Sequence, residues 1–139
     1  MAAHFAYLEN SIDMNNRGMF SLISLLLDSV KLVPNDEHTC HIEKLENLWE
    51  NEYWNGRGFE IEEDFDGLEE CKFWYASFLK LADDIFERAV GDHTELSWQK
   101  TIIYYAVSVS ELFLLRIRSE EPKWEIKEKP IFLFPNQHK

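Results

Sequence analysis

Apolar residues recur at steps of three and four through most of this chain, and that spacing is typical of one face of an α-helix. Proline and glycine break the pattern at Pro34, at 55–58, at 91–92 and at Pro122. A chain of 139 residues fits one domain, and 45% apolar residues are enough for a hydrophobic core. We therefore predict an all-α, single-domain bundle of four to five helices over residues 1–139.

The predicted helices lie between these breaks. Residues 4–33 keep one apolar phase across Asn15–Gly18, which favours one long helix with a weak point there, and two helices joined at that point are the close alternative. A second helix is predicted from a cap at 35 or 36 to about 54. A third is predicted from 66 to about 90, and a fourth, the most apolar, from about 95 to 119.

Two segments fall outside these helices. Residues 59–66 are predicted to form an acidic loop or a short extended piece, with Phe59, Ile61 and Phe65 as apolar anchors. Asp66 followed by Glu69 is typical of the capping box that opens a helix. The slightly basic tail carries apolar residues between two prolines, and we expect it to pack on the bundle in extended form, with 130–139 partly extended or frayed.

Charge is distributed very unevenly along the chain. Residues 35–71 hold 13 of the 26 acids and only two bases, Lys44 and Arg57, so their formal charge is -11, whereas the other 102 residues come to -1. On the predicted second helix, Glu43, Glu46 and Glu50 follow one another at steps of three and four, where like charges destabilise a helix. A solvated face usually alternates its charges, so this row indicates a binding surface.

Aromatic residues are interleaved with these acids. Large rings bury much area at interfaces, and carboxylates around them raise the rate and specificity of association with a basic partner. Trp49 fits the helix core, whereas Tyr53, Trp54 and Phe59 lie near a turn. The predicted partner-binding residues are Glu43, Glu46, Glu50, Tyr53, Trp54, Phe59, Glu62, Glu63, Asp64 and Asp66.

The overall charge excludes several classes of partner. A pI near 4.8 argues against direct binding of nucleic acid or of anionic membranes, because both require Lys and Arg.

No apolar stretch reaches the roughly 18 residues of a membrane span, and the N-terminus lacks the pattern of a secretory signal. Two cysteines 31 residues apart imply no disulfide framework, so we expect a cytoplasmic protein.

Metal-binding patterns are weak in this sequence. Glu62, Asp64, Asp66 and Gly67 match the first, third, fifth and sixth positions of a calcium-binding EF-hand loop, but the twelfth position is Phe73 instead of glutamate. Zinc ligands are available, but their spacing matches no standard arrangement. They are His38, Cys40, His41 and Cys71. We expect no metal and no cofactor.

No catalytic motif is present, so we predict that the chain is not an enzyme. Glu111 lies in the most apolar helix, where a partly exposed or Arg-paired carboxylate is the preferred interpretation. A small helical enzyme or ligand-binding domain, with a merely solubilising acidic face, remains an alternative. A deep pocket lined by Glu111, Tyr104 or Tyr105 would favour it.

Small size, helical periodicity and interleaved acids and aromatics together resemble the acidic immunity proteins of bacterial toxin–immunity pairs, including contact-dependent growth inhibition systems. The residues that carry this resemblance are Glu43, Glu46, Trp49, Glu50, Tyr53 and Trp54. It implies a one-to-one complex with a cognate basic toxin domain, often a nuclease, whose active site is occluded. A nucleic-acid mimic that inhibits a defence enzyme is a second alternative, although acids confined to one band favour a local plug.

Overall fold

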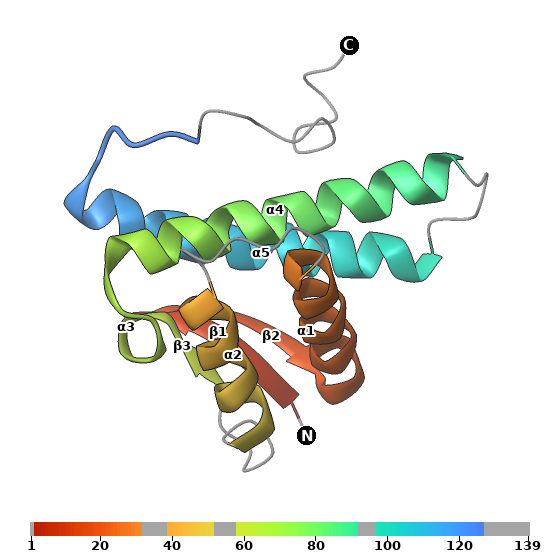
Figure 1. The fold of residues 1–139 in the computed structure, drawn as a ribbon, viewed down its shortest axis with the longest axis horizontal. Coiled ribbons are helices and arrows are strands. Elements are labelled where there is room, and N and C mark those ends of the chain that lie inside the picture. Colours follow the sequence, from red (N-terminus) through yellow and green to blue (C-terminus); the bar gives the residue numbers. More distant parts are fainter. Residues whose placement is uncertain (1, 32–38, 52–57, 92–96, 127–139) are drawn as a thin grey trace.

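The computed structural model describes residues 2–31, 39–51, 58–91 and 97–126, which form a mostly helical structure with one small sheet (Figure 1). The elements in chain order are β1 (Ala2–Tyr7), β2 (Asn10–Asn15), α1 (Asn16–Lys31), α2 (Thr39–Asn51), β3 (Phe59–Glu60), α3 (Ile61–Asp64), α4 (Gly67–Gly91) and α5 (Ser97–Glu120). The helical character was predicted, but the sheet was not, and an all-α bundle is therefore too simple a description.

The N-terminal segment corrects the predicted long helix over 4–33. Residues 2–15 form an antiparallel hairpin in which Tyr7 pairs with Asn10. The two-residue connection begins at Leu8, whose φ of 54° lies in the left-handed region that L-residues rarely adopt. The stretch from Ser11 to Asn15 alternates polar and apolar residues, and this period of two is the strand signal. The helical spacing across Asn15–Gly18 was coincidental, since short apolar runs are ambiguous between helix and strand.

The suspected weak point at Asn15–Gly18 is the start of α1. The Asn15 side chain accepts a hydrogen bond from the Gly18 backbone N–H at 2.6 Å, which is the geometry of an N-cap. From there the apolar stripe of α1 is buried at Met19, Leu22, Ile23 and Leu26. The alternative of two helices joined at this point was right about the boundary and about the second helix, but the first of its two helices is a hairpin.

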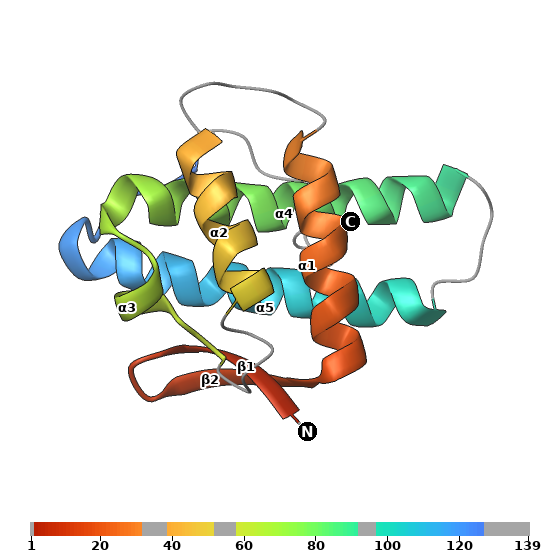
Figure 2. The ribbon, with the colours of Figure 1, turned by 60° about the horizontal axis from the view of Figure 1, so that its bottom comes forward.

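The helices form two layers. Helices α4 and α5 lie antiparallel, and α1, α2 and the sheet cover one side of this pair (Figures 1 and 2). In both views α2 lies between α1 and α3. None of the helices in the described ranges combines the length and apolarity needed to cross a membrane.

Aromatic rings join the layers in the core. Strand β1 is central in the sheet, whose order is β2-β1-β3, and it pairs with β3 in parallel. Phe5 of β1 stacks on Phe59 at 4.6 Å between ring centroids and meets Phe78 of α4 edge-on at 5.7 Å. Phe65 packs edge-on against Phe113 of α5 at 5.0 Å. These contacts fix the acidic segment 59–66 to the core through its apolar residues, as predicted for Phe59, Ile61 and Phe65.

The start of α4 differs from the predicted capping box. The carboxylate that reaches back is Glu70, which accepts a hydrogen bond from the Asp66 backbone N–H at 2.9 Å. Glu69 instead points to solvent and approaches Lys72 at 3.5 Å. Gly67 adopts a φ of 71°, which glycine tolerates without strain, and this turn shifts the reaching carboxylate by one residue.

Candidate protein-binding surface

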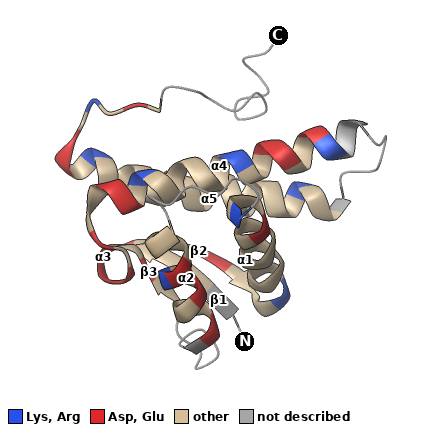
Figure 3. Ribbon diagram, in the orientation of Figure 1, with Lys and Arg blue, Asp and Glu red and all other residues tan. Residues whose placement is uncertain are grey.

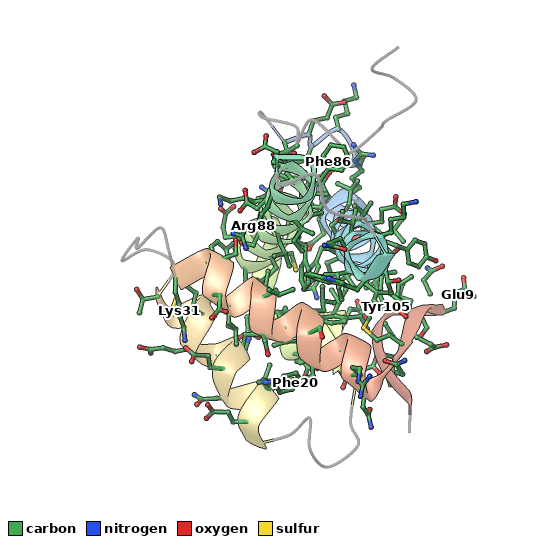
Figure 4. All side chains as sticks on the ribbon, turned by 90° about the vertical axis from the view of Figure 1, so that its right-hand side faces the viewer. Glu9, Phe20, Lys31, Phe86, Arg88 and Tyr105 are labelled. Carbon is green, nitrogen blue, oxygen red and sulfur yellow. The ribbon has the colours of Figure 1, made fainter. Side chains whose placement is uncertain are left out.

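Helix α2 is attached to α1 along one side. Lys31 at the end of α1 forms an ion pair with Glu46 at 2.9 Å. Nearer the other end, the rings of Phe20 and Trp49 lie 6.2 Å apart between centroids. Figure 4 shows Phe20 between the two helices. Trp49 is buried, as its core assignment predicted, whereas half of Phe20 remains exposed, at 51%.

The opposite side of α2 is attached to the start of α4 by a polar network. The Lys44 ammonium approaches Glu70 at 3.0 Å and Asp66 at 3.2 Å. His41 Nδ1 lies 2.9 Å from the other oxygen of Glu70. Partial burial disfavours the charge on Lys44, but its hydrogen bonds to Glu70 and Asp66 outweigh burial and raise its pKa above the usual value. Lys44, the only lysine or arginine of α2, is therefore paired with carboxylates of the protein itself.

These attachments leave the outer side of α2 acidic. Glu43 and Glu50 are exposed there, three residues before and four residues after Glu46. Glu62 is exposed on α3, beside α2. Within the ranges that the structure describes, no ion-pair partner is found for Glu43, Glu50 or Glu62. Figure 3 shows acidic ribbon segments on both α2 and α3. Among the described residues, only the middle member of the row of like charges, Glu46, is compensated, by Lys31 of α1.

The acids of α3 are positioned by the short strand that precedes it. His4 of β1 contacts Glu60 at 3.0 Å, and the Glu60 backbone N–H donates to Asp64 at 2.7 Å. Gly58 lies under the His4 ring, where a Cβ atom would meet ring atoms at 2.5 Å, so only glycine allows this approach. Glu62 and Glu63 then project from the single turn of α3 and are exposed.

The predicted partner-binding residues divide into three groups. The structure leaves six of them at least partly accessible along α2, α3 and the turn before α4: Glu43, Glu46, Glu50, Glu62, Glu63 and Asp66. The side chains of Phe59 and Asp64 are buried, because Phe59 stacks in the core and Asp64 holds the Glu60 backbone, so neither is offered to a partner. Tyr53 and Trp54 lie outside the described residues.

Phe20 was not among the predicted site residues. Its signal in the sequence was weak but present, since it falls off the buried stripe formed by Met19, Leu22 and Ile23. Only the position of α2 reveals that it lies beside Trp49 and close to the acidic row. We use the name acidic face for this surface, which consists of Glu43, Glu46, Glu50, Glu62, Glu63 and Asp66 with Phe20 at its edge.

The candidate zinc ligands in the described ranges lie on α2 and α4, and two of the three candidate pocket residues on α5 are exposed. No group of three or more His, Cys, Asp or Glu side chains there is arranged to hold a metal ion. Cys71 is buried in the core and Cys40 is exposed, while His38 lies outside the described residues. Glu111 and Tyr104 point to solvent, and Tyr104 is 63% exposed, so they do not line a deep pocket together.

Comparisons with protein-family models, curated proteins and solved structures find no match for this chain.

Proposed function

We propose that this protein is an immunity-type inhibitor, which binds a basic toxin domain through the acidic face and blocks its active site. The observation that carries this proposal is the direction of the charges on α2. Lys44 is engaged by Glu70 and Asp66, whereas Glu43 and Glu50 on α2 and Glu62 on the neighbouring α3 are exposed and have no cationic partner among the described residues. Such a surface attracts a partner that exposes Lys and Arg, as nucleases do toward phosphate.

Phe20 adds an apolar anchor to the charged residues of the acidic face. Exposed carboxylates mainly accelerate association, while the lifetime of a complex depends on apolar anchors that become desolvated. The Phe20 ring is half-exposed and is supported from behind by Trp49. It lies on the α1 side of the acidic face, so one partner surface can contact the ring and the carboxylates together. The proposal includes a one-to-one complex in the cytoplasm, without a cofactor and without catalysis.

The first experiment identifies the partner. A pull-down from the native host at low and high salt, with identification by mass, should recover a basic protein that arrests growth when it is expressed alone. Co-expression of this chain should restore growth. Recovery of a DNA- or RNA-processing defence enzyme that is not toxic by itself would favour the nucleic-acid-mimic alternative. Recovery of no protein at either salt would remove the support for a binding role.

Charge reversal then tests the surface. We expect the double variant Glu43→Lys/Glu50→Lys to slow association with the recovered partner by at least tenfold at low salt, because it inverts the local potential. The matched control is Glu87→Lys/Glu120→Lys, which changes the net charge equally on exposed sites of α4 and α5. Equal slowing by both variants would mean that net charge alone steers the encounter, and the acidic face would lose its assigned role.

A further inference from the structure

One long edge of the sheet is unpaired. In the order β2-β1-β3, strand β2 is an outer strand, and among the described residues no further strand pairs with it. Four of its six side chains are exposed. Figure 2 shows the hairpin of β1 and β2 along the lower border of the molecule. The outer edge of β2 is therefore accessible over its length.

This edge lacks the usual protection against further pairing. Proteins cover or interrupt an outer strand with lysine, proline, a bulge or a very short length. Strand β2 has the sequence NSIDMN, in which Asp13 is the only charged residue. Its pairing with β1 runs through six consecutive residue pairs without a bulge. The unpaired backbone N–H and C=O groups can therefore accept one more strand.

The hairpin loop determines which backbone groups face this edge. Because the loop has two residues, Tyr7 and Asn10 form its closing hydrogen-bonded pair. Hydrogen-bonded and non-hydrogen-bonded pairs then alternate along the antiparallel ladder. The backbone groups of the even-numbered residues of β2 thus point to β1, and those of Ser11, Asp13 and Asn15 point outward.

A second copy of β2 fits this edge in one antiparallel register. Hydrogen-bonded pairs must join outward-pointing residues, and like charges directly opposite each other are destabilising. Opposing Asp13 to itself is unfavourable for that reason, and opposing Ser11 to itself would bring Glu9 opposite Asp13. Registers shifted further along the strand run into α1, which begins at Asn16. The remaining register pairs Ser11 of each copy with Asp13 of the other.

The side chains suit this register. Within one strand the Ser11 hydroxyl already donates a hydrogen bond to the Asp13 carboxylate at 3.0 Å, and the same two groups meet across the symmetric pair. At its ends, Glu9 of one copy approaches the start of α1 of the other, where Arg17 is exposed. Neither Glu9 nor Arg17 has an ion-pair partner in the described part of the chain. Figure 4 shows Glu9 at the outer margin of the hairpin.

We propose that two copies of this chain associate through their β2 edges and join their sheets into one two-fold symmetric sheet. Helix α3 continues directly from β3, so the acidic face lies toward the other edge of the sheet and stays accessible in the dimer. The inference is therefore independent of the proposed function, and each copy keeps its own binding surface. An edge of six residues is small beside a standard interface of about 1,600 Å², so the dimer forms reversibly as concentration rises.

Sedimentation velocity of the full chain over a hundredfold range of concentration tests the proposal. We expect a reversible shift from monomer to dimer, and Ser11→Pro should weaken dimerisation at least tenfold. Proline removes an outward N–H and leaves the hydrogen bonds to β1 intact. The control Ser11→Ala keeps that N–H and should change the dissociation constant threefold or less.

Two results of this experiment would overturn the proposal. One is a chain that stays monomeric at every concentration, including one in which Ser11→Pro weakens binding to a recovered partner instead, because the edge would then bind the partner. The other is a dimer that Ser11→Pro leaves unchanged while circular dichroism shows a native fold, because another surface would then hold the copies together.

Disulfide cross-linking tests the register without the proline variant. In a Cys40→Ser background, in which the remaining Cys71 is buried, Ile12→Cys places two thiols opposite each other on the two-fold axis. Cα atoms of such a non-hydrogen-bonded pair lie about 4.5 Å apart, within the disulfide range of roughly 4.4–6.8 Å. The control is Ser11→Cys, a more exposed position whose two copies lie about 7–8 Å apart on the diagonal.

With oxidised glutathione as the oxidant, we expect the Ile12→Cys variant to form the covalent dimer at least tenfold faster than the Ser11→Cys variant. Random collision predicts the reverse order, because the Ser11 position is more exposed. Equal or faster linking of the Ser11→Cys variant would therefore overturn the proposed pairing.

Discussion

Replacement of Glu70 by alanine should lower the free energy of unfolding by about 3 kcal/mol. The side chain is only 4% exposed and bonds the Lys44 ammonium at 3.0 Å, His41 at 2.9 Å and the Asp66 backbone N–H at 2.9 Å. A net hydrogen bond contributes roughly 1 kcal/mol, and one to a charged group roughly 1.5–3 kcal/mol. Lys44 is partly exposed and keeps Asp66, so the full cost of an isolated buried charge, about 3–5 kcal/mol, does not apply.

Urea unfolding followed by circular dichroism at 222 nm measures this loss. The matched control is Glu69→Ala, one residue earlier, whose side chain is 89% exposed and approaches Lys72 at 3.5 Å. Exposed pairs contribute about 0–1 kcal/mol, so the control should change little. Glu70→Gln, which retains an acceptor for the Asp66 N–H, should fall between the two. If Glu70→Ala were no more destabilising than Glu69→Ala, the network would not be what holds α2 against α4.

Two further predictions concern the hairpin and the core. Leu8→Asn should raise the free energy of unfolding by roughly 1 kcal/mol, because asparagine tolerates the left-handed region that leucine occupies at a φ of 54°. The control is Glu9→Asn. Equal effects of the two variants in thermal unfolding would refute the argument. Burial raises the pKa of the Cys71 thiol to about 11 from 9.0, so the folded state retains a proton that the unfolded state loses, and stability should fall by up to about 2–3 kcal/mol as pH rises from 9 to 11. In urea titrations across this pH window, the free energy of unfolding of a Cys71→Ala variant should fall less steeply with pH. An unchanged dependence on pH would contradict this prediction.

The helices α4 and α5 were predictable because their signals are local. Each has a long apolar period, and Pro122 follows the last turn of α5. The hairpin was missed because its apolar residues also fit a helical step, and only pairing across strands decides between the two. β3 contributes two residues to the sheet, too few for any sequence pattern to indicate.

The acidic surface was partly predictable. The step of three and four separates Glu43, Glu46 and Glu50 from the buried stripe, so their common side followed from helix geometry. The burial of Phe59 and Asp64 did not follow, because it depends on contacts with β1 and with the Glu60 backbone. Phe20 was overlooked for the same reason, since its neighbour Trp49 is far away in the sequence.

By itself the sequence determined how charge and apolar residues are distributed, and therefore that the segments of α1, α2, α4 and α5 are helical and which stretch of the chain is acidic. Tertiary structure alone decided that Lys44 turns inward to Glu70, that Phe5 stacks on Phe59, and that Phe20 remains exposed beside Trp49. The physical reason is the range of the interactions. Periodicity and charge are properties of neighbouring residues, whereas ion pairs, ring stacking and strand pairing join residues that only the folded chain brings together.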